Sequence, residues 1–184
     1  MTRPPGWLAG LMLAGLLLTG CASSRATPTS ATASAGQHTG STAEPSAAAL
    51  MICSDDIRGK VRQALALPAP PAATDSFVGG RYTCTYRLPA GPLALAVQQS
   101  PDHAAASRYY AGQQLALRGD DLPGLGEAAF GTGTGIVVVV KDDATLTVDA
   151  TGLPAVFGPQ QQRRTDLAYE IASDVLGCWT GDDS

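Results

Sequence analysis

Three pairs of adjacent aspartates and a histidine are the side chains best suited to hold a metal ion or move protons. The pairs are Asp55-Asp56, Asp120-Asp121 and Asp142-Asp143, and His103 is the one histidine beyond residue 50. A metal site needs several His, Cys or carboxylate ligands at matched spacing, and calcium loops add an Asp-x-Asp-x-Asp run with a closing Glu. Neither pattern occurs here. We therefore expect solvated acids, a solvated His103 and no metal site.

Two further patterns bear on catalysis. The segment Gly131-Thr132-Gly133-Thr134-Gly135 is as rich in glycine as a phosphate-binding loop. Such a loop leads into a helix and carries a Lys-Ser/Thr pair, whereas here an aliphatic stretch follows and the pair is missing. The sequence also lacks a Gly-x-Ser-x-Gly elbow, the usual sign of a serine hydrolase. We expect no catalytic residue and no cofactor, and we assign the glycine run to a connection between strands.

The first of the four cysteines lies in a pattern that predicts lipidation. Arg3 precedes an apolar run, Leu8–Leu18, and the sequence Leu18-Thr19-Gly20-Cys21 follows. The run rises only about 16 Å as a helix, too short for a hydrocarbon core of about 30 Å. Its end resembles the lipobox of bacterial lipoproteins, which implies loss of residues 1–20 and acylation of Cys21. The protein would then be anchored to the extracytoplasmic face of the cell membrane through that lipid.

Residues 21–49 read as the lipidated cysteine followed by a tether. Ser, Thr, Ala, Gly and Pro dominate the segment, which shows no aliphatic periodicity, so we expect disorder and an end-to-end distance of about 30 Å. The chain after residue 20 carries 11 basic and 16 acidic side chains, a net charge of −5. This mild acidity argues against nucleic acid as a partner.

Three cysteines remain in the segment 50–179: Cys53, Cys84 and Cys178. An exported compartment favours oxidation, so one disulfide is expected and one thiol is left over. Cys84 alternates with Tyr82 and Tyr86 and shares their face. Residue spacing leaves two pairings open, Cys53–Cys84 and Cys53–Cys178, because geometry decides between them.

The elements that would position these side chains follow from hydrophobic periodicity and capping residues. Helices are predicted for Asp55 to about Leu67, for Ser100 to about Leu117 with Ser100 as N-cap, and for Leu167–Leu176 with Gly177 as the stop. Strands are predicted for Arg81–Leu88, Leu93–Val97, Leu125–Phe130, Ile136–Val140 and Thr145–Asp149. Pro68–Thr74 reads as a loop.

This order, α-β-β-α-β-β-β-α, places hairpin strands between helices without βαβ alternation. It predicts an α+β fold with an antiparallel sheet of about five strands and three helices packed on it. A segment of about 130 residues supports one core, so residues 50–179 should form a single domain, with 180–184 as a tail.

Several short motifs together resemble a known group of proteins. Cys53 precedes a capped helix, Cys84 lies in a Cys-Thr-Tyr strand, and Gly124-Leu125-Gly126-Glu127-Ala128-Ala129-Phe130 comes before a strand-turn-strand unit. With the lipobox, these are similar to small actinobacterial lipoproteins that share an uncharacterised, disulfide-containing α+β domain, some of them compared with the PsbP-like fold. The resemblance implies that Cys53 pairs with Cys84. We therefore predict this pair, which leaves Cys178, beside Trp179, as a buried thiol.

The sequence predicts no specific activity. We expect a lipid-anchored envelope protein, not an enzyme, whose domain binds an unknown small molecule or protein. The alternatives are an enzyme with dispersed catalytic residues and a structural accessory subunit of an envelope complex. A concave apolar pocket would favour a small-molecule ligand, and a flat apolar patch would favour a protein partner.

Overall fold

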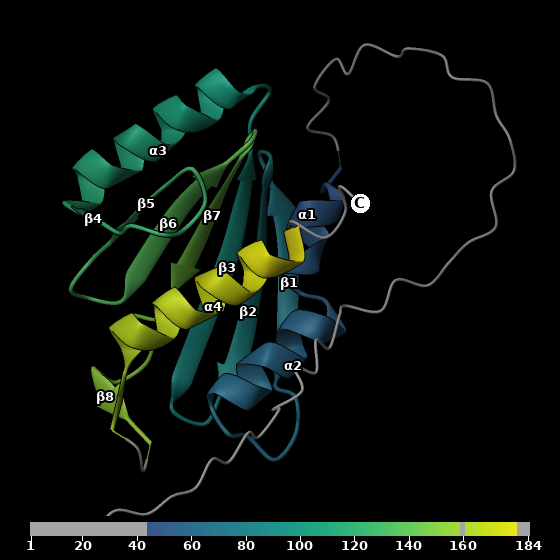
Figure 1. Cartoon of the computed structure of the whole chain (residues 1–184). Coiled ribbons are helices and arrows are strands. Elements are labelled where there is room, and N and C mark those ends of the chain that lie inside the picture. The colour runs from purple at the N-terminus through teal and green to yellow at the C-terminus, as the bar shows by residue number, and fades with distance from the viewer. Residues whose placement is uncertain (1–43, 159–160, 180–184) are drawn as a thin grey trace, which may run out of the picture.

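The computed structural model describes residues 44–158 and 161–179 (Figure 1). Cys21, the signal segment, most of the expected tether and the tail lie outside these residues. The described helices are α1 Ala47–Met51, α2 Asp55–Ala64, α3 His103–Leu117 and α4 Arg164–Trp179. The described strands are β1 Ala72–Val78, β2 Arg81–Leu88, β3 Gly91–Gln99, β4 Asp120–Asp121, β5 Ala128–Gly131, β6 Ile136–Lys141, β7 Ala144–Asp149, β8 Val156–Phe157 and β9 Gln162–Arg163.

Seven of the strands form one antiparallel sheet in the order β1-β2-β3-β7-β6-β5-β4, and β8 and β9 form a separate two-stranded sheet. Chain neighbours pair as hairpins, and the one non-local pairing joins β3 to β7. The expected α+β class with an antiparallel sheet is confirmed. The expected count of five strands and three helices is wrong, since the described residues contain seven strands in the main sheet and four helices.

The elements that the sequence did not predict are short or exposed. Strand β1 occupies the sheet edge, and most of its side chains face solvent, so it lacks the apolar alternation of a half-buried strand. Helix α1 is alanine-rich and only five residues long, and it falls where the tether was expected. The folded part therefore starts before the predicted boundary at residue 50. Strands β4, β8 and β9 are two residues each, below any periodicity signal.

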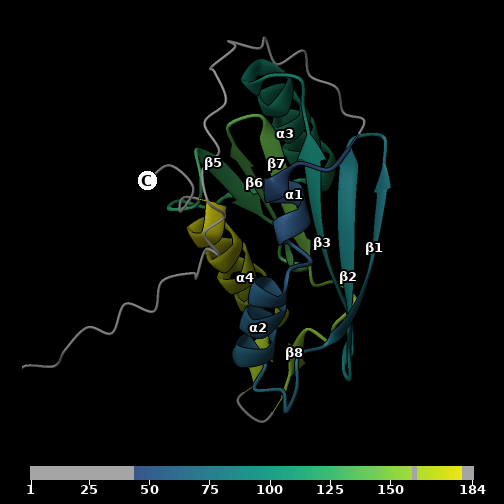
Figure 2. The same ribbon diagram turned by 90° about the vertical axis from the view of Figure 1, so that its right-hand side faces the viewer.

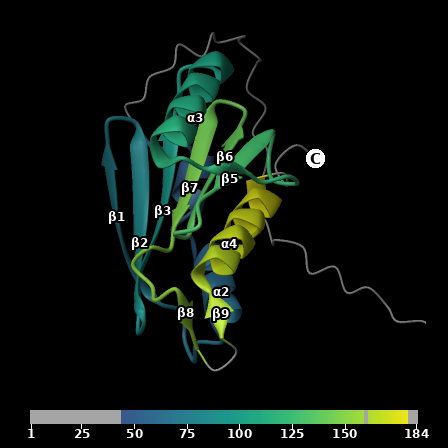
Figure 3. The same ribbon diagram turned by 90° about the vertical axis from the view of Figure 1, so that its left-hand side faces the viewer.

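Helices cover both faces of the sheet. Figure 2 shows α1, α2 and α4 on one side, where the main core gathers around Tyr86, Leu95, Leu146 and Ile171. Figure 3 shows α3 across the part of the sheet formed by β5, β6 and β7 on the opposite face. There Tyr110 packs on Phe130, with ring centroids 5.4 Å apart. Strands β1 and β2 extend beyond α3, so that part of this face carries no described helix.

Two helix boundaries differ from the predictions for local reasons. Helix α3 begins at His103 because Asp102, not Ser100, is the N-cap and accepts a hydrogen bond from the Ala105 amide at 2.7 Å. Helix α4 continues through Gly177 to Trp179. Cys178 and Trp179 are buried, and the Trp179 indole donates to the Ala48 carbonyl at 3.1 Å. Burial of this last turn outweighs the preference of glycine for a helix end.

Candidate functional site

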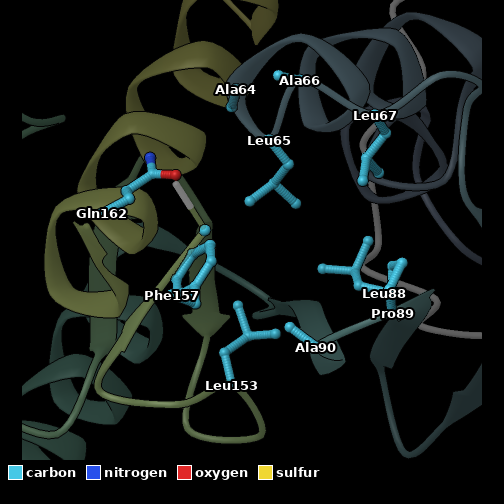
Figure 4. A pocket seen from close by; sticks show the side chains of 11 residues that line it. Ala64, Leu65, Ala66, Leu67, Leu88, Pro89, Ala90, Leu153, Phe157 and Gln162 are labelled. Carbon is cyan, nitrogen blue, oxygen red and sulfur yellow. The ribbon is translucent and has the colours of Figure 1, made fainter. Parts of the chain in front are cut away.

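The described residues enclose an apolar pocket at the end of the sheet opposite α1 (Figure 4). Its volume is about 190 Å³, and it is partly open to solvent. Three regions supply its described walls: the end of α2, the β2–β3 turn, and a third group made of Leu153, Phe157 and Gly158 with Gln162 of β9. The side chains that define it are Leu65, Leu67, Leu88, Leu153, Phe157 and Gln162.

The end of α2 forms one wall through a Schellman cap. The Leu67 amide donates to the Arg62 carbonyl at 2.9 Å, and the Ala66 amide donates to the Gln63 carbonyl at 3.1 Å. The motif needs a left-handed residue after the cap, and Ala66 takes that role with φ 49°. Leucines stand on both sides of this tight turn, and in Figure 4 Leu65 and Leu67 both extend toward the pocket.

The opposite wall depends on close backbone packing between two glycines. Gly91 has φ 136°, and a Cβ at this position would lie 2.1 Å from the Gly152 carbonyl oxygen. A Cβ on Gly152 would in turn lie 2.5 Å from the Pro92 carbonyl oxygen. Only residues without a side chain allow this approach. It brings the β2–β3 turn, which carries Leu88, against the loop that carries Leu153.

Arg164 fixes the same loop from the start of α4. Its guanidinium Nη1 donates to the Leu153 carbonyl at 2.9 Å and to the Thr151 carbonyl at 3.3 Å. Its aliphatic stem packs over Gly135, where a Cβ would lie 2.9 Å from the Arg164 Cγ. Gly135, the last glycine of the Gly131–Gly135 run, therefore makes room for a structural arginine. The run leads into strand β6 and forms no phosphate-binding helix start.

Among the described residues, the pocket lining carries no charged side chain. Gln162 is the one polar side chain of that described lining, and its amide nitrogen donates to Glu170 at 3.3 Å. The amide oxygen is thereby turned to the pocket side, as Figure 4 shows. An uncharged, apolar lining favours the neutral, apolar part of a ligand, with Gln162 able to accept one hydrogen bond at the rim.

A covalent bond and a polar bond hold the segment between α1 and α2 against strand β2. Cys53 and Cys84 form a disulfide with Cα atoms 5.5 Å apart, the pair that the family resemblance implies. The alternative pair, Cys53–Cys178, is wrong, because Cys178 is a buried thiol at the end of α4. The Tyr86 hydroxyl donates to the Ile52 carbonyl. Burial is the main cause that raises the pKa of Tyr86 well above its ordinary value, so this hydroxyl stays a donor.

The acid pairs lie apart from one another and from the pocket. Asp55-Asp56 opens α2, Asp120-Asp121 forms β4, and Asp142-Asp143 forms the β6–β7 turn. Within residues 44–158 and 161–179, no three His, Cys, Asp or Glu side chains are grouped so that they could hold a metal ion.

His103 takes part in a local relay that the sequence did not predict. Its Nδ1 lies 2.9 Å from the Asp142 carbonyl oxygen and 3.4 Å from a Glu127 carboxylate oxygen, and its Nε2 lies 3.4 Å from the Ser107 hydroxyl. This is the order of an acid, a base and a nucleophile. The His103 and Glu127 side chains are 59% and 44% exposed, however, and no described pocket contains both His103 and Ser107. The contact of His103 with the Asp142 carbonyl joins α3 to the β6–β7 turn.

Comparisons with known proteins add no assignment: no family model, curated protein or solved structure matches the chain. Among the described helices, none is both long and apolar enough to cross a membrane. The pocket itself was missed at the sequence level. Its signal was present as leucines next to loop prolines, at Leu67-Pro68 and Leu88-Pro89, where a solvated loop would carry polar residues.

Proposed function

We propose that this protein is a lipid-anchored binding protein of the cell envelope whose domain takes up a small, neutral, apolar molecule or the apolar end of a larger one. The apolar pocket between the end of α2, the β2–β3 turn and Leu153 carries the proposal. Concave sites lined by aliphatic side chains with one placed polar group are typical of small-molecule binding. The expectation that the domain is non-catalytic stays part of the proposal.

The size and chemistry of the pocket set the expected affinity. A volume of about 190 Å³ accepts a ring system or a short alkyl chain and leaves a larger ligand's head outside. Burial of about 250 Å² of ligand surface at about 25 cal/mol per Å² sets the tightest dissociation constant at tens of micromolar, and the lost translational freedom of the ligand weakens binding below that limit. A charged ligand group would have no partner among the described lining residues, so we expect neutral compounds to bind more tightly than carboxylates of the same length.

The anchoring part of the proposal rests on the sequence. Cys21 carries the lipid and becomes the first residue of the mature protein, which places the domain on the extracytoplasmic face of the membrane. The resemblance to small actinobacterial lipoproteins is part of this proposal, and the Cys53–Cys84 disulfide supports it. Intact-mass analysis should show loss of residues 1–20 and gain of a diacylglyceryl group. A Cys21→Ala protein that stays in the membrane fraction would overturn the anchoring.

The binding proposal is tested with N-phenyl-1-naphthylamine, a neutral apolar fluorophore, titrated into the purified protein. We expect saturable enhancement of fluorescence and displacement by octanol and decanol. The Ala90→Trp variant places a large ring at the β2–β3 turn that borders the pocket, and it should weaken binding at least about tenfold.

Ala104→Trp is the matched control, since Ala104 is an exposed alanine on the distant helix α3. Both variants should show the circular dichroism spectrum and melting temperature of the parent protein. Equal probe affinity in Ala90→Trp and Ala104→Trp would overturn the assignment of the pocket as the binding site.

A further inference from the structure

Strand β1 leaves a row of backbone groups without a strand partner. Gly79 and Gly80, with φ of 60° and 76°, form a two-residue turn between Val78 and Arg81. In such a turn the flanking residues bond to each other, and the bonded pairs then alternate along the hairpin. Ala73, Asp75 and Phe77 therefore direct their N–H and C=O groups away from β2. Among the described residues no strand lies on that side of β1.

This edge lacks the features that usually prevent strand addition. It is seven residues long, contains no lysine or proline, and carries one charge, Asp75. The opposite edge of the same sheet is β4, which has only two residues. Native proteins blunt long edges with charges, prolines or short strands, and an unblunted edge is a template for another strand. Val78, at the end of β1, is also 77% exposed.

We propose that β1 pairs with β1 of a second copy of this chain, in antiparallel orientation, around a two-fold axis at Ser76. The choice of a second copy rests on the complementarity of the strand with itself in this register. Asp75 then faces Phe77, Thr74 faces Val78, and Ser76 faces Ser76. No like charges are directly opposed. On each side of the two-fold axis, Asp75 of one copy and Phe77 of the other exchange backbone hydrogen bonds.

In three other registers the backbone groups of Ala73, Asp75 and Phe77 would also point at the partner strand, but each of these registers is energetically less favourable. An axis at Asp75 sets two carboxylates directly opposite each other, which is destabilising. An axis at Thr74 brings Pro71 into the ladder, where it has no N–H to donate. An axis at Phe77 brings Gly79 opposite Asp75, although Gly79 has the left-handed φ of a turn residue. The axis at Ser76 keeps residues 74–78 paired without any of these costs.

The pairing is compatible with the apolar pocket, because β1 contributes no residue to the pocket lining. It would join two seven-stranded sheets into one continuous sheet. An interface based on five residues per copy is small for a stable dimer in dilute solution. Confinement to one membrane surface raises the effective concentration and favours the pairing there. The pairing rests on the membrane anchoring of the proposed function and does not depend on the pocket binding a ligand.

Cysteine crosslinking in the exporting cell tests the register directly. Ser76 faces itself in a non-hydrogen-bonded pair, with Cα atoms about 4.5 Å apart, within the range of a disulfide. Its side chain lies on the face opposite Cys84, because Cys84 pairs with the preceding residue, Asp75. We expect the full-length Ser76→Cys protein to run as a disulfide-linked dimer on a non-reducing gel. Thr74→Cys and Thr134→Cys, both at exposed positions, should stay monomeric.

A proline at an outward-facing position is the second test. The double variant Ser76→Cys/Asp75→Pro lacks the N–H of residue 75, so one backbone hydrogen bond is lost on each side of the two-fold axis. The yield of disulfide-linked dimer should fall at least about fivefold. Ser76→Cys/Asp75→Asn keeps the N–H and should retain the dimer. Any one of three results would overturn the proposal. They are the absence of a dimer in Ser76→Cys, an equal yield of disulfide-linked dimer in Thr134→Cys, and a crosslink of Ser76→Cys to a different protein.

Discussion

Two regions of the domain are built from different interactions. Around α1, in the region that we call the fastened end, a disulfide and hydrogen bonds hold residues 44–54 against β2 and α4. At the pocket end, aliphatic side chains from three loops face one another, and the polar bonds lie behind the walls. The fastened end fixes the point at which the preceding chain enters the domain. The pocket end leaves apolar surface accessible, which is where a ligand gains binding energy.

Hydrogen bonds attach residues 44–52 to the rest of the domain at several points. The Ser46 amide donates to the Gln99 side chain at 2.8 Å, and Gln99 donates back to the Glu44 carbonyl at 3.3 Å. The Trp179 indole holds Ala48, and the Tyr86 hydroxyl holds Ile52. A pull on the chain at residue 44 is therefore resisted before it reaches the pocket. This arrangement suits a domain that is tethered at one end and binds at the other.

The largest effect should come from removing the disulfide. Replacing both Cys53 and Cys84 with serine releases a crosslink across 31 residues, and we expect a loss of about 3 to 4 kcal/mol in the free energy of unfolding. Urea denaturation measures it. Because neither cysteine lines the pocket, the probe affinity of the protein that remains folded should stay within about twofold of the parent value. A parallel loss of affinity would show that the two ends are not independent.

Gly91→Ala should damage the pocket end instead. The added Cβ meets the Gly152 backbone, and alanine is strained at φ 136°, so we expect a loss of about 2 to 3 kcal/mol together with weaker probe binding. The matched control is Gly59→Ala inside α2, where a Cβ meets nothing within 4 Å. That variant should gain up to about 1 kcal/mol from helix propensity. Unchanged binding in Gly91→Ala would contradict the role of the glycine contact.

Tyr86→Phe should weaken the fastened end by about 1 to 2 kcal/mol, because the Ile52 carbonyl loses its buried donor. The pH dependence gives a second readout. Burial raises the pKa of Tyr86 above the ordinary value of 10.0. The hydroxyl therefore contributes fully below pH 10, and its contribution is lost as the pH rises through the raised value.

Stability of the parent protein should thus fall at alkaline pH, from about pH 10 upward, and the fall should be shallower in Tyr86→Phe. Urea midpoints measured at pH 8, 10 and 11 compare the two proteins. Identical slopes above pH 10 would show that Tyr86 ionises in the folded state as readily as in the unfolded chain.

The smallest effect expected is a gain at the pocket end. Ala66 occupies the left-handed position of the α2 cap with φ 49°, where glycine is the usual residue. Ala66→Gly should relieve that strain and stabilise the domain by about 0.5 to 1 kcal/mol. A rise in melting temperature with unchanged probe affinity is the expected outcome. Destabilisation would mean that the Ala66 side chain contributes more through packing than its backbone loses through strain.

The sequence predicted those elements in which burial follows a regular period. The hairpin of β6 and β7 matches the expected strands to within a residue at each end, because Ile136–Val140 and its returning partner are apolar and bounded by an obvious turn. Strand β1 escaped prediction because Thr74, Asp75 and Ser76 are solvent-facing edge residues. Its pairing with β2 depends on backbone bonds that leave no hydrophobic pattern.

The pocket could not be predicted from periodicity for a different reason. Its described walls come from residues 64–67, residues 88–90, and a third group formed by Leu153, Phe157, Gly158 and Gln162. These segments contact one another only after the sheet and α4 are in place. Leu67 and Leu88 are visible in the sequence as apolar residues in turns, but their mutual placement is a tertiary property. The Ser107–His103–Glu127 relay is hidden in the same way, since its acid lies on another loop.

The most direct test of the binding function is methyl nuclear magnetic resonance of leucine-labelled protein during titration with octanol. The methyl signals of Leu65, Leu88 and Leu153 should shift together and saturate with one dissociation constant. Leu115, which is 84% exposed on α3, serves as the internal control and should not move. Pocket leucines that stay fixed at saturating octanol, or shifts no larger than those of Leu115, would contradict the assignment of this end of the molecule as a ligand site.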